Sequence, residues 1–315
     1  MSGMGFYLTT LAIYAGLNGI LVLGLNMQFG VTGIFNFAYI LLVAVGAYAT
    51  GVAALPAAVA GPGPQYVGGF GWAFPYDVLF GMAVTVVFAL VLALIAFRRI
   101  ANWYLALTLS AISWALLVLV TNYVPLFNGL IGLTGVPAPW QDTLDPVTYQ
   151  FVFLGVVVVA LVLTYAVMWR VERSPLGRAL RATREDAVAT SSLGKSPVAL
   201  KTVGFLLGAA AAGLGGGLSI IYLGGWSPQS WGSGETFVLL SAVIIGGRGW
   251  ANGAFLGSII VLEGIIEGSR FLPDVAGRAD LLPALQSVAI GVLLLAVLWW
   301  RPRGLWPEPK ERFER

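Results

Sequence analysis

Residues 6–27 read FYLTTLAIYAGLNGILVLGLNM and carry no charged side chain. No residue of the charged class (Asp, Glu, Lys and Arg) occurs from Met1 to Tyr76, and Asp77 is the first. A typical soluble domain draws about a quarter of its residues from this class. Here the class makes up 10% of 315 residues, whereas 58% are hydrophobic. The composition predicts an all-α, polytopic membrane protein, because a helix satisfies its own backbone in lipid.

Apolar runs follow one another along the whole chain, and most have the length of about 20 residues that a helix needs to cross a bilayer. They are 6–27, 34–55, 78–97, 103–124, 149–169, 202–223, 236–247, 251–268 and 282–300. The run 236–247 is short and leaves open whether it crosses fully. We expect one membrane-embedded domain over 1–315, with about eight or nine transmembrane helices that include short or interrupted segments.

The basic residues predict the orientation of the chain. Fourteen of the 17 Lys and Arg lie in three segments, 98–101, 170–201 and 301–315. Because cytoplasmic loops carry the excess of Lys and Arg, these segments are predicted to be cytoplasmic, with 301–315 as a cytoplasmic tail. Helix counting then places the N-terminus outside. Residues 1–10 lack the basic start of a signal peptide, so the first apolar run is interpreted as a retained span.

The residue types that are missing exclude several functions. The chain has neither Cys nor His, which removes the usual zinc ligands, thiol nucleophiles and histidine bases. Gly194-Lys195-Ser196 resembles the end of a phosphate-binding loop, but position 189 is Ala where that loop needs Gly. The sequence therefore predicts no catalytic residue, no metal site, no nucleotide hydrolysis by this chain and no nucleic-acid partner.

The segment 170–201 has the pattern of a short helical hairpin. Ser174-Pro175 is typical of a helix start, because a hydroxyl caps free amides and Pro fits the first turn. Small and apolar residues share one face, arginines with Glu185 occupy much of the rest, and Gly194 is a plausible end. The residues of the apolar face are Leu176, Ala179, Leu180, Thr183 and Ala187. Two interpretations stay open: a topology signal that rests on lipid headgroups, and a docking element for a cytoplasmic partner.

Two segments punctuated by glycine, 29–39 and 245–253, interrupt otherwise plain spans. Interrupted segments in corresponding halves of a chain point to a transport pathway. Close packing of small residues is the competing explanation. The candidate pathway residues are Gly30, Gly33, Phe35, Asn36, Tyr39, Gly246 and Gly247.

Glu263 lies inside an apolar run, one helical turn from Glu267. An ionisable residue in a span is a candidate for substrate contact or ion coupling. An interfacial or paired structural role is the alternative.

The combination of motifs resembles the permease subunits of branched-chain amino acid ABC importers, of the LivM type. The resemblance is carried by Ser174–Glu185, Leu193-Gly194, the small-residue run 209–217, Gly246–Gly249 and the ending 301–305. It covers about residues 30–305 and is strongest after residue 170.

The resemblance implies an ABC importer permease fold in the cytoplasmic membrane of a prokaryote. It implies a second permease subunit of the LivH type, two ATP-binding subunits and an extracytoplasmic substrate-binding protein, with membrane lipid around them. ATP and Mg²⁺ then belong to the partners, and this chain binds no cofactor. Segment 170–201 becomes the part that couples to an ATPase, through Gly177, Arg178, Arg181, Arg184, Glu185 and Gly194.

Other functions compete with this one. A permease for urea, amides or another small solute shares the superfamily. An ion-coupled secondary transporter would work alone, but the spans hold few ionisable residues. A membrane enzyme lacks catalytic groups. A purely structural subunit, whose pathway lies in its partner, is the remaining alternative.

Overall fold

The computed structural model describes residues 3–57, 65–99, 102–141, 143–268 and 281–308. The described chain is an all-α bundle with one two-residue antiparallel strand pair, β1 with β2. In chain order the elements are α1 (Gly3–Leu25), η1 (Asn26–Val31), α2 (Tyr39–Ala54), α3 (Tyr76–Arg99), α4 (Asn102–Asn122), α5 (Val124–Phe127), β1 (Leu133–Thr134), α6 (Pro146–Arg173), α7 (Pro175–Glu185), α8 (Ala187–Ser192), α9 (Pro197–Leu223), β2 (Gly225–Trp226), η2 (Pro228–Trp231), α10 (Ser233–Gly246), α11 (Ala251–Ser258), η3 (Ile259–Glu267) and α12 (Leu281–Trp300).

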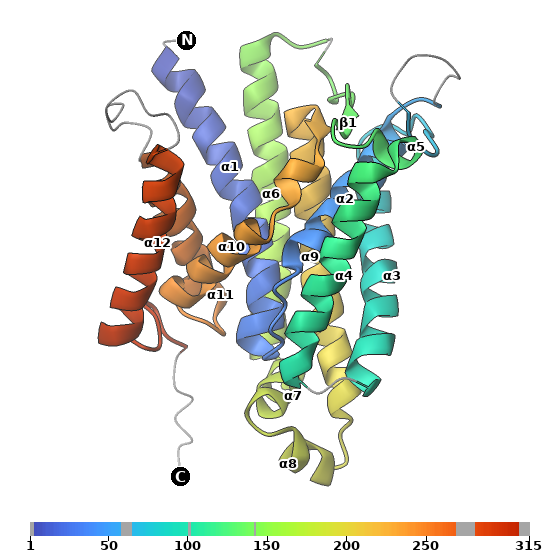
Figure 1. The fold of residues 1–315 in the computed structure, drawn as a ribbon. Helices are drawn as coiled ribbons and strands as arrows, with labels where there is room; N and C mark the ends of the chain where they lie inside the picture. Colours follow the sequence, from blue (N-terminus) through green and yellow to red (C-terminus); the bar gives the residue numbers. More distant parts are fainter. Residues whose placement is uncertain (1–2, 58–64, 100–101, 142, 269–280, 309–315) are drawn as a thin grey trace.

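The long helices run side by side, and the connections gather at two ends (Figure 1). The first turn of α1 lies at the end that holds α5 and β1, whereas α7 and α8 project from the other. The C-terminal end of α3 and residues 301–308 lie at the α7 end. The described parts of all three basic segments therefore share one end. Residues 100–101 and 309–315 of those segments lie outside the described residues.

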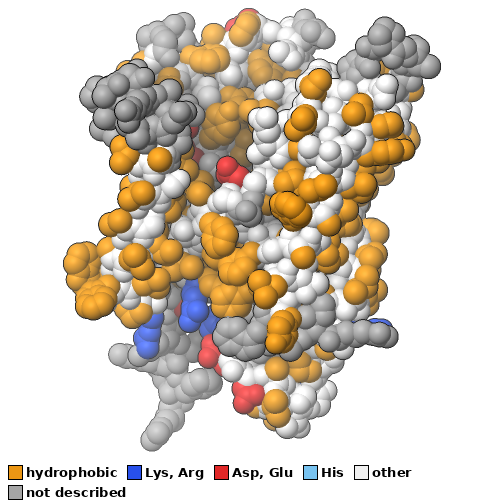
Figure 2. All heavy atoms as spheres, viewed as in Figure 1, with side chains coloured by type: hydrophobic (Ala, Val, Ile, Leu, Met, Phe, Trp, Pro, Cys, Tyr) orange, Lys and Arg blue, Asp and Glu red, His pale blue; other side chains and the backbone are white. Residues whose placement is uncertain are grey.

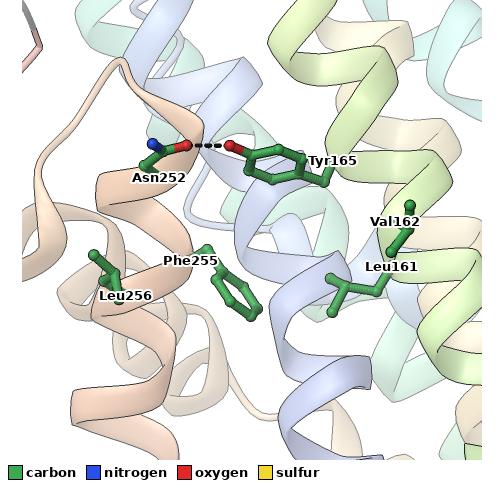
Figure 3. Close-up of a pocket in the computed structure, with 6 residues that line it drawn as sticks. All are labelled: Leu161, Val162, Tyr165, Asn252, Phe255 and Leu256. Atoms are coloured by element: carbon green, nitrogen blue, oxygen red, sulfur yellow. Dashed lines mark hydrogen bonds between the residues drawn. The ribbon is translucent and has the colours of Figure 1, made fainter.

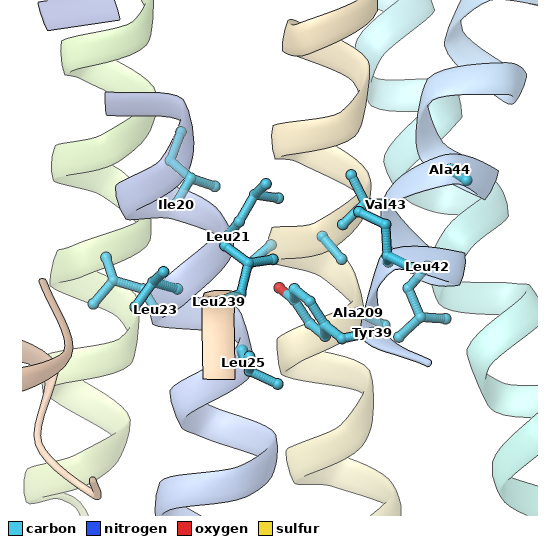
Figure 4. Close-up of a cluster of buried hydrophobic side chains, with 14 of the residues drawn as sticks. Ile20, Leu21, Leu23, Leu25, Tyr39, Leu42, Val43, Ala44, Ala209 and Leu239 are labelled. Atoms are coloured by element: carbon cyan, nitrogen blue, oxygen red, sulfur yellow. The ribbon is translucent and has the colours of Figure 1, made fainter. Parts of the chain in front are cut away.

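Helix α9 forms the centre of the core because its small residues admit neighbouring backbones. It packs against α1, α2 and α3. A Cβ added to Gly46 on α2 would stand 2.6 Å from the Gly213 Cα on α9. Figure 4 shows the apolar side chains beside this contact, where Leu21, Leu25, Tyr39 and Ala209 point into one buried cluster.

The outer surface matches a lipid environment. Figure 2 shows hydrophobic side chains over most of the height of one face, with Lys and Arg only in its lower part, mainly below α11 and α12. Five described helices are long and apolar enough to cross a membrane: α1 continued by η1, α3, α4, α6 and α9. Shorter apolar helices are α2, α10 and part of α12. The expectation of an all-α polytopic membrane protein is confirmed.

The run 236–247 does not cross as one straight helix. Helix α10 has 14 residues, which give about 21 Å of length against about 30 Å of hydrocarbon. The chain from β2 to Gly249 still passes from one end of the bundle towards the other. Strand β2 pairs with β1 at the upper end, and Gly249 contacts Asn26 near the lower one. The extended residues and η2 supply the rest of the distance.

The hairpin predicted in 170–201 is present, with a break that the pattern did not show. The Ser174 hydroxyl accepts from the Gly177 amide at 3.2 Å, so the predicted cap is confirmed. Helix α7 ends at Glu185, because Asp186 turns extended and its carboxylate caps α8 through the amides of Val188 and Ala189. Gly194 follows α8 in the left-handed region (φ +76°) that favours glycine.

Candidate functional site

A buried polar cluster joins the α7 hairpin to both glycine-punctuated segments. We call this cluster the junction, and it consists of Asn26, Gly30, Glu172, Arg181, Arg184, Gly249, Ala251 and Glu308. These residues come from η1, the last turn of α6, α7, the turn between α10 and α11, the first residue of α11, and the C-terminal segment. The junction therefore brings four helix ends and the segment after α12 together at a single place.

The carboxylate of Glu172 is the acidic centre of the junction. Its Oε1 accepts from Asn26 Nδ2 at 3.3 Å, and its Oε2 accepts from the Ala251 amide at 3.1 Å. Asn26 Oδ1 accepts from the Gly249 amide at 2.8 Å. Both side chains are almost fully buried, so these hydrogen bonds act where water does not replace them.

Two arginines of α7 face this centre rather than the solvent. Arg181 Nη1 donates to the Glu172 carbonyl at 3.0 Å, and its Nε lies 3.1 Å from Glu308 Oε1. Arg184 donates to the Gly30 carbonyl and lies 3.7 Å from Glu308 Oε2. The cationic face of α7 is thus attached to η1, α6 and the C-terminal segment together.

The C-terminal segment lies along the turn that follows α10. The Leu305 and Trp306 amides donate to the carbonyls of Ile245 and Gly246, each at 2.9 Å. Gly247 adopts a positive φ (+128°), and Gly304 packs on its backbone. This pairing brings Glu308 within reach of the α7 arginines.

The six residues predicted to couple to an ATPase fall into two groups. Arg181 and Arg184 point inward, and Gly177 is buried against the carbonyls of the last α6 turn. Arg178, Glu185 and Gly194 are exposed. Only the second group is open to a partner in this structure, because the two arginines are held in the junction and Gly177 is buried.

The predicted pathway residues lie close together but are packed. Gly30 and Gly249 are in contact, which brings the two glycine-punctuated segments side by side. Of the seven residues only Phe35 is exposed, and its ring meets Phe29 edge-on at 5.0 Å. The remaining members, buried or partly buried, are Gly30, Gly33, Asn36, Tyr39, Gly246 and Gly247. Their role in a pathway stays a prediction.

Glu263 lies in η3 and is partly buried. Asn18 Nδ2 on α1 donates to its Oε1 at 3.2 Å. The acid therefore has a polar contact within the bundle, which suits the structural role and leaves the substrate or ion-coupling role a prediction.

A groove of about 390 Å³ separates α6 from α11 just beside the junction. Figure 3 shows Leu161, Phe255 and Leu256 around it, and a hydrogen bond from Tyr165 to Asn252 Oδ1 at one edge. Tyr165 lies seven residues before Glu172, hence on the same face of α6. Helix α6 therefore holds the first residues of α11 by polar groups and leaves an apolar gap along the rest.

The sequence matches the family described as "Branched-chain amino acid transport system / permease component" over residues 7–298. The chain belongs to this permease family. A relative named probable branched-chain amino acid transport permease protein LivM, from Methanocaldococcus jannaschii, is 26% identical over 96% of this chain and 93% of its own length. A high-affinity LivM from Escherichia coli is 29% identical over 91% of this chain and 67% of its own length. No solved structure matches the chain significantly.

Sequence reasoning missed two acids of this permease, Glu172 and Glu308. Both sit among basic residues, Glu172 between Arg170 and Arg173 and Glu308 beside Lys310. A lone acid inside a basic run was the available signal for Glu172. No local pattern linked Glu308 to α7, because its partners lie more than 120 residues earlier.

Proposed function

We propose that this permease is the membrane subunit of an ABC importer that moves branched-chain, hydrophobic amino acids across the cytoplasmic membrane of a prokaryote. Family membership and the names of the relatives support the solute class. The proposed assembly adds a second permease of the LivH type, two ATP-binding subunits and an extracytoplasmic binding protein. ATP hydrolysis takes place in the partners, and this chain performs no covalent chemistry.

The α7–α8 hairpin is the observation that carries this proposal. It projects from the end of the bundle where the described basic residues gather, which the positive-inside rule assigns to the cytoplasm. Val188 and Leu193 are 75% and 80% exposed there. Apolar side chains at a cytoplasmic tip have no lipid around them and suit a protein partner.

The opposite face of the hairpin explains how movement would reach the membrane. Arg181 and Arg184 fasten α7 to η1, α6 and the C-terminal segment. An ATPase that displaces α8 would therefore move the junction with it. The glycine-punctuated segments meet at that junction, and their relative displacement would open the path on one side and close it on the other.

Aspartate substitutions at the tip test the docking surface. Val188→Asp and Leu193→Asp place charge on the exposed apolar positions and should abolish co-purification of the ATP-binding subunits in mild detergent. Val67→Asp is the matched control, because Val67 is 57% exposed at the opposite end. Loss of the ATPases from the tip variants alone supports the proposal.

Two outcomes would contradict the proposal. Full recovery of the ATPases with both tip variants would place docking elsewhere. A wild-type chain that purifies without partners and transports along an ion gradient would favour the secondary-transporter alternative. The solute is tested separately, by competition of leucine, isoleucine, valine and urea for uptake by the reconstituted assembly.

A further inference from the structure

Helix α11 begins without a cap of its own. Its N-cap position is Trp250, whose side chain makes no capping hydrogen bond. The first amides of a helix need partners, because the helix itself supplies none. The Ala251 amide and the preceding Gly249 amide instead donate to Glu172 and Asn26, from α6 and η1.

Every side-chain oxygen and nitrogen of the two capping residues has a partner in this arrangement. Glu172 accepts one hydrogen bond on each carboxylate oxygen. Asn26 accepts through Oδ1 and donates through Nδ2. Both are buried, with exposures of 4% and 1%. A carboxylate at a helix N-terminus also interacts favourably with the helix dipole.

The same Glu172 lies directly before the α7 hairpin. Ser174, two residues later, caps α7, and Gly177 packs against the Glu172 carbonyl. Arg181 donates to that carbonyl at 3.0 Å. Helix α7 therefore holds the main chain of the residue whose side chain holds α11.

The groove between α6 and α11 increases the importance of the hydrogen bond from the Ala251 amide to Glu172. Along the rest of the α6–α11 boundary lies the apolar groove of about 390 Å³, bordered by Leu161, Val162 and Phe255. Close packing there is incomplete, so rotation of α6 does not push α11 directly. The polar groups at the junction, with Tyr165 and Asn252, are the main direct connection between α6 and α11.

We infer that Glu172 and Asn26 form the link that transmits displacement of the α7 hairpin to the start of α11. Glu172 is a positioning residue in this scheme, because it holds backbone amides and contacts no solute. When α7 moves, the last turn of α6 moves the Glu172 carboxylate. The start of α11 follows through the Ala251 amide, and the preceding turn follows through the Gly249 amide on Asn26. The inference rests on the proposed function and adds a residue-level route to it.

An exchange of hydrogen-bonding roles tests the link. Glu172→Gln keeps the shape but replaces one acceptor by an NH₂ group, which meets a second donor in either amide orientation: Asn26 Nδ2 or the Ala251 amide. Asn26→Asp alone puts two carboxylates together. In the double variant the new amide at 172 donates to the new carboxylate at 26, and the Gly249 and Ala251 amides keep an acceptor each. Net charge is conserved as well.

The reconstituted importer provides the functional measurement. Each single variant should raise the ATP hydrolysed per solute transported by about fivefold, as loss of one net hydrogen bond implies. The double variant should return the ratio to within about twofold of wild type, because it removes both the donor–donor contact of one single variant and the carboxylate–carboxylate contact of the other. The control is Asp145→Ala at the far end of α6, where Asp145 caps the helix through the Thr148 amide and hydroxyl at 3.2 and 2.6 Å. It removes a comparable cap and should leave the ratio unchanged.

A second measurement does not depend on the partners. Hydrogen–deuterium exchange on the purified chain should show amides 249–252 exchanging about fivefold faster in each single variant and at the wild-type rate in the double variant. Unchanged exchange and an unchanged ATP ratio in Glu172→Gln would overturn the link while the importer assembly stands. A chain that recruits no ATPase yet shows the exchange pattern would overturn the proposed function and the transmission role together, leaving Glu172 a structural cap.

Discussion

Helix α9 meets α2 and α3 backbone against backbone, whereas α6 meets α11 through a few polar side chains and a groove. In the first region glycines remove the side chains that would keep the helices apart, as at Gly46 and Gly213. In the second, Glu172 and Tyr165 reach across, and about 390 Å³ stays unfilled. The first arrangement allows little movement, because a small displacement causes clashes in close-packed helices. The second can shift at the cost of a few hydrogen bonds.

The difference suggests that the two regions have different roles in the permease. The α2–α3–α9 region would act as the fixed body, and α10, α11 and the junction would act as the part that changes position. The proposed docking hairpin is connected to both, since α9 begins directly after it and α7 contacts the junction. The predictions below test the rigid region first and the weaker contacts afterwards.

Gly216→Val should have the largest effect, because it breaks the rigid region. A Cβ at Gly216 on α9 would collide with the Val43 carbonyl of α2, which belongs to the backbone and does not rotate away. We expect a loss of about 1–3 kcal/mol or more of stability. Thermal unfolding in detergent measures it, and Gly155→Ala on α6 is the control, since nothing lies within 4 Å of its added methyl group. Equal melting temperatures for both variants would contradict the rigid-body interpretation.

Tyr165→Phe should have an intermediate effect confined to the α6–α11 region. It removes the hydroxyl that donates to Asn252 Oδ1 and leaves the ring in place. The expected loss is about 1 kcal/mol, seen as faster hydrogen–deuterium exchange in the first turn of α11. Tyr222→Phe provides a matched control, because its hydroxyl donates to Gln150 Oε1 at 3.3 Å near the other end of α6. Faster exchange of α11 in both variants would show that the effect is general loosening.

The sequence predicted those features that depend on neighbouring residues. The spans follow from apolar length, and the start of α7 follows from Ser174-Pro175, where a hydroxyl and a ring act within one turn. The orientation of Arg181 and Arg184 was not predictable in this way. A helical pattern separates polar from apolar faces but does not show that a polar face has buried partners.

The junction escaped prediction because its members are distant in the sequence. Asn26 and Glu172 are 146 positions apart, and Asn26 and Gly249 are 223 apart. The glycine pattern marks the segments 29–39 and 245–253 as interrupted, yet their contact with each other and with α7 depends on how α1, α6 and α10 pack. Tertiary packing, which local pattern does not determine, also explains why α10 is shorter than a full span.

Glu308→Gln should have the smallest effect, because it removes ion pairs at the partly exposed edge of the junction. Glu308 lies 3.1 Å from Arg181 Nε and 3.7 Å from Arg184 Nη2, and its side chain is 29% exposed. Pairs of this kind contribute about 0.2–1 kcal/mol and are screened by salt. We therefore expect a small fall in melting temperature at low salt that disappears near 1 M salt, where the Debye length is about 3 Å. Arg303→Gln, at an exposed position of the same segment, should change the melting temperature little at either salt concentration. A fall in the melting temperature of Glu308→Gln that persists in high salt would mean that the C-terminal segment is held as firmly as the α2–α3–α9 region. The junction would then belong with the rigid region, and only the groove between α6 and α11 would remain loosely packed.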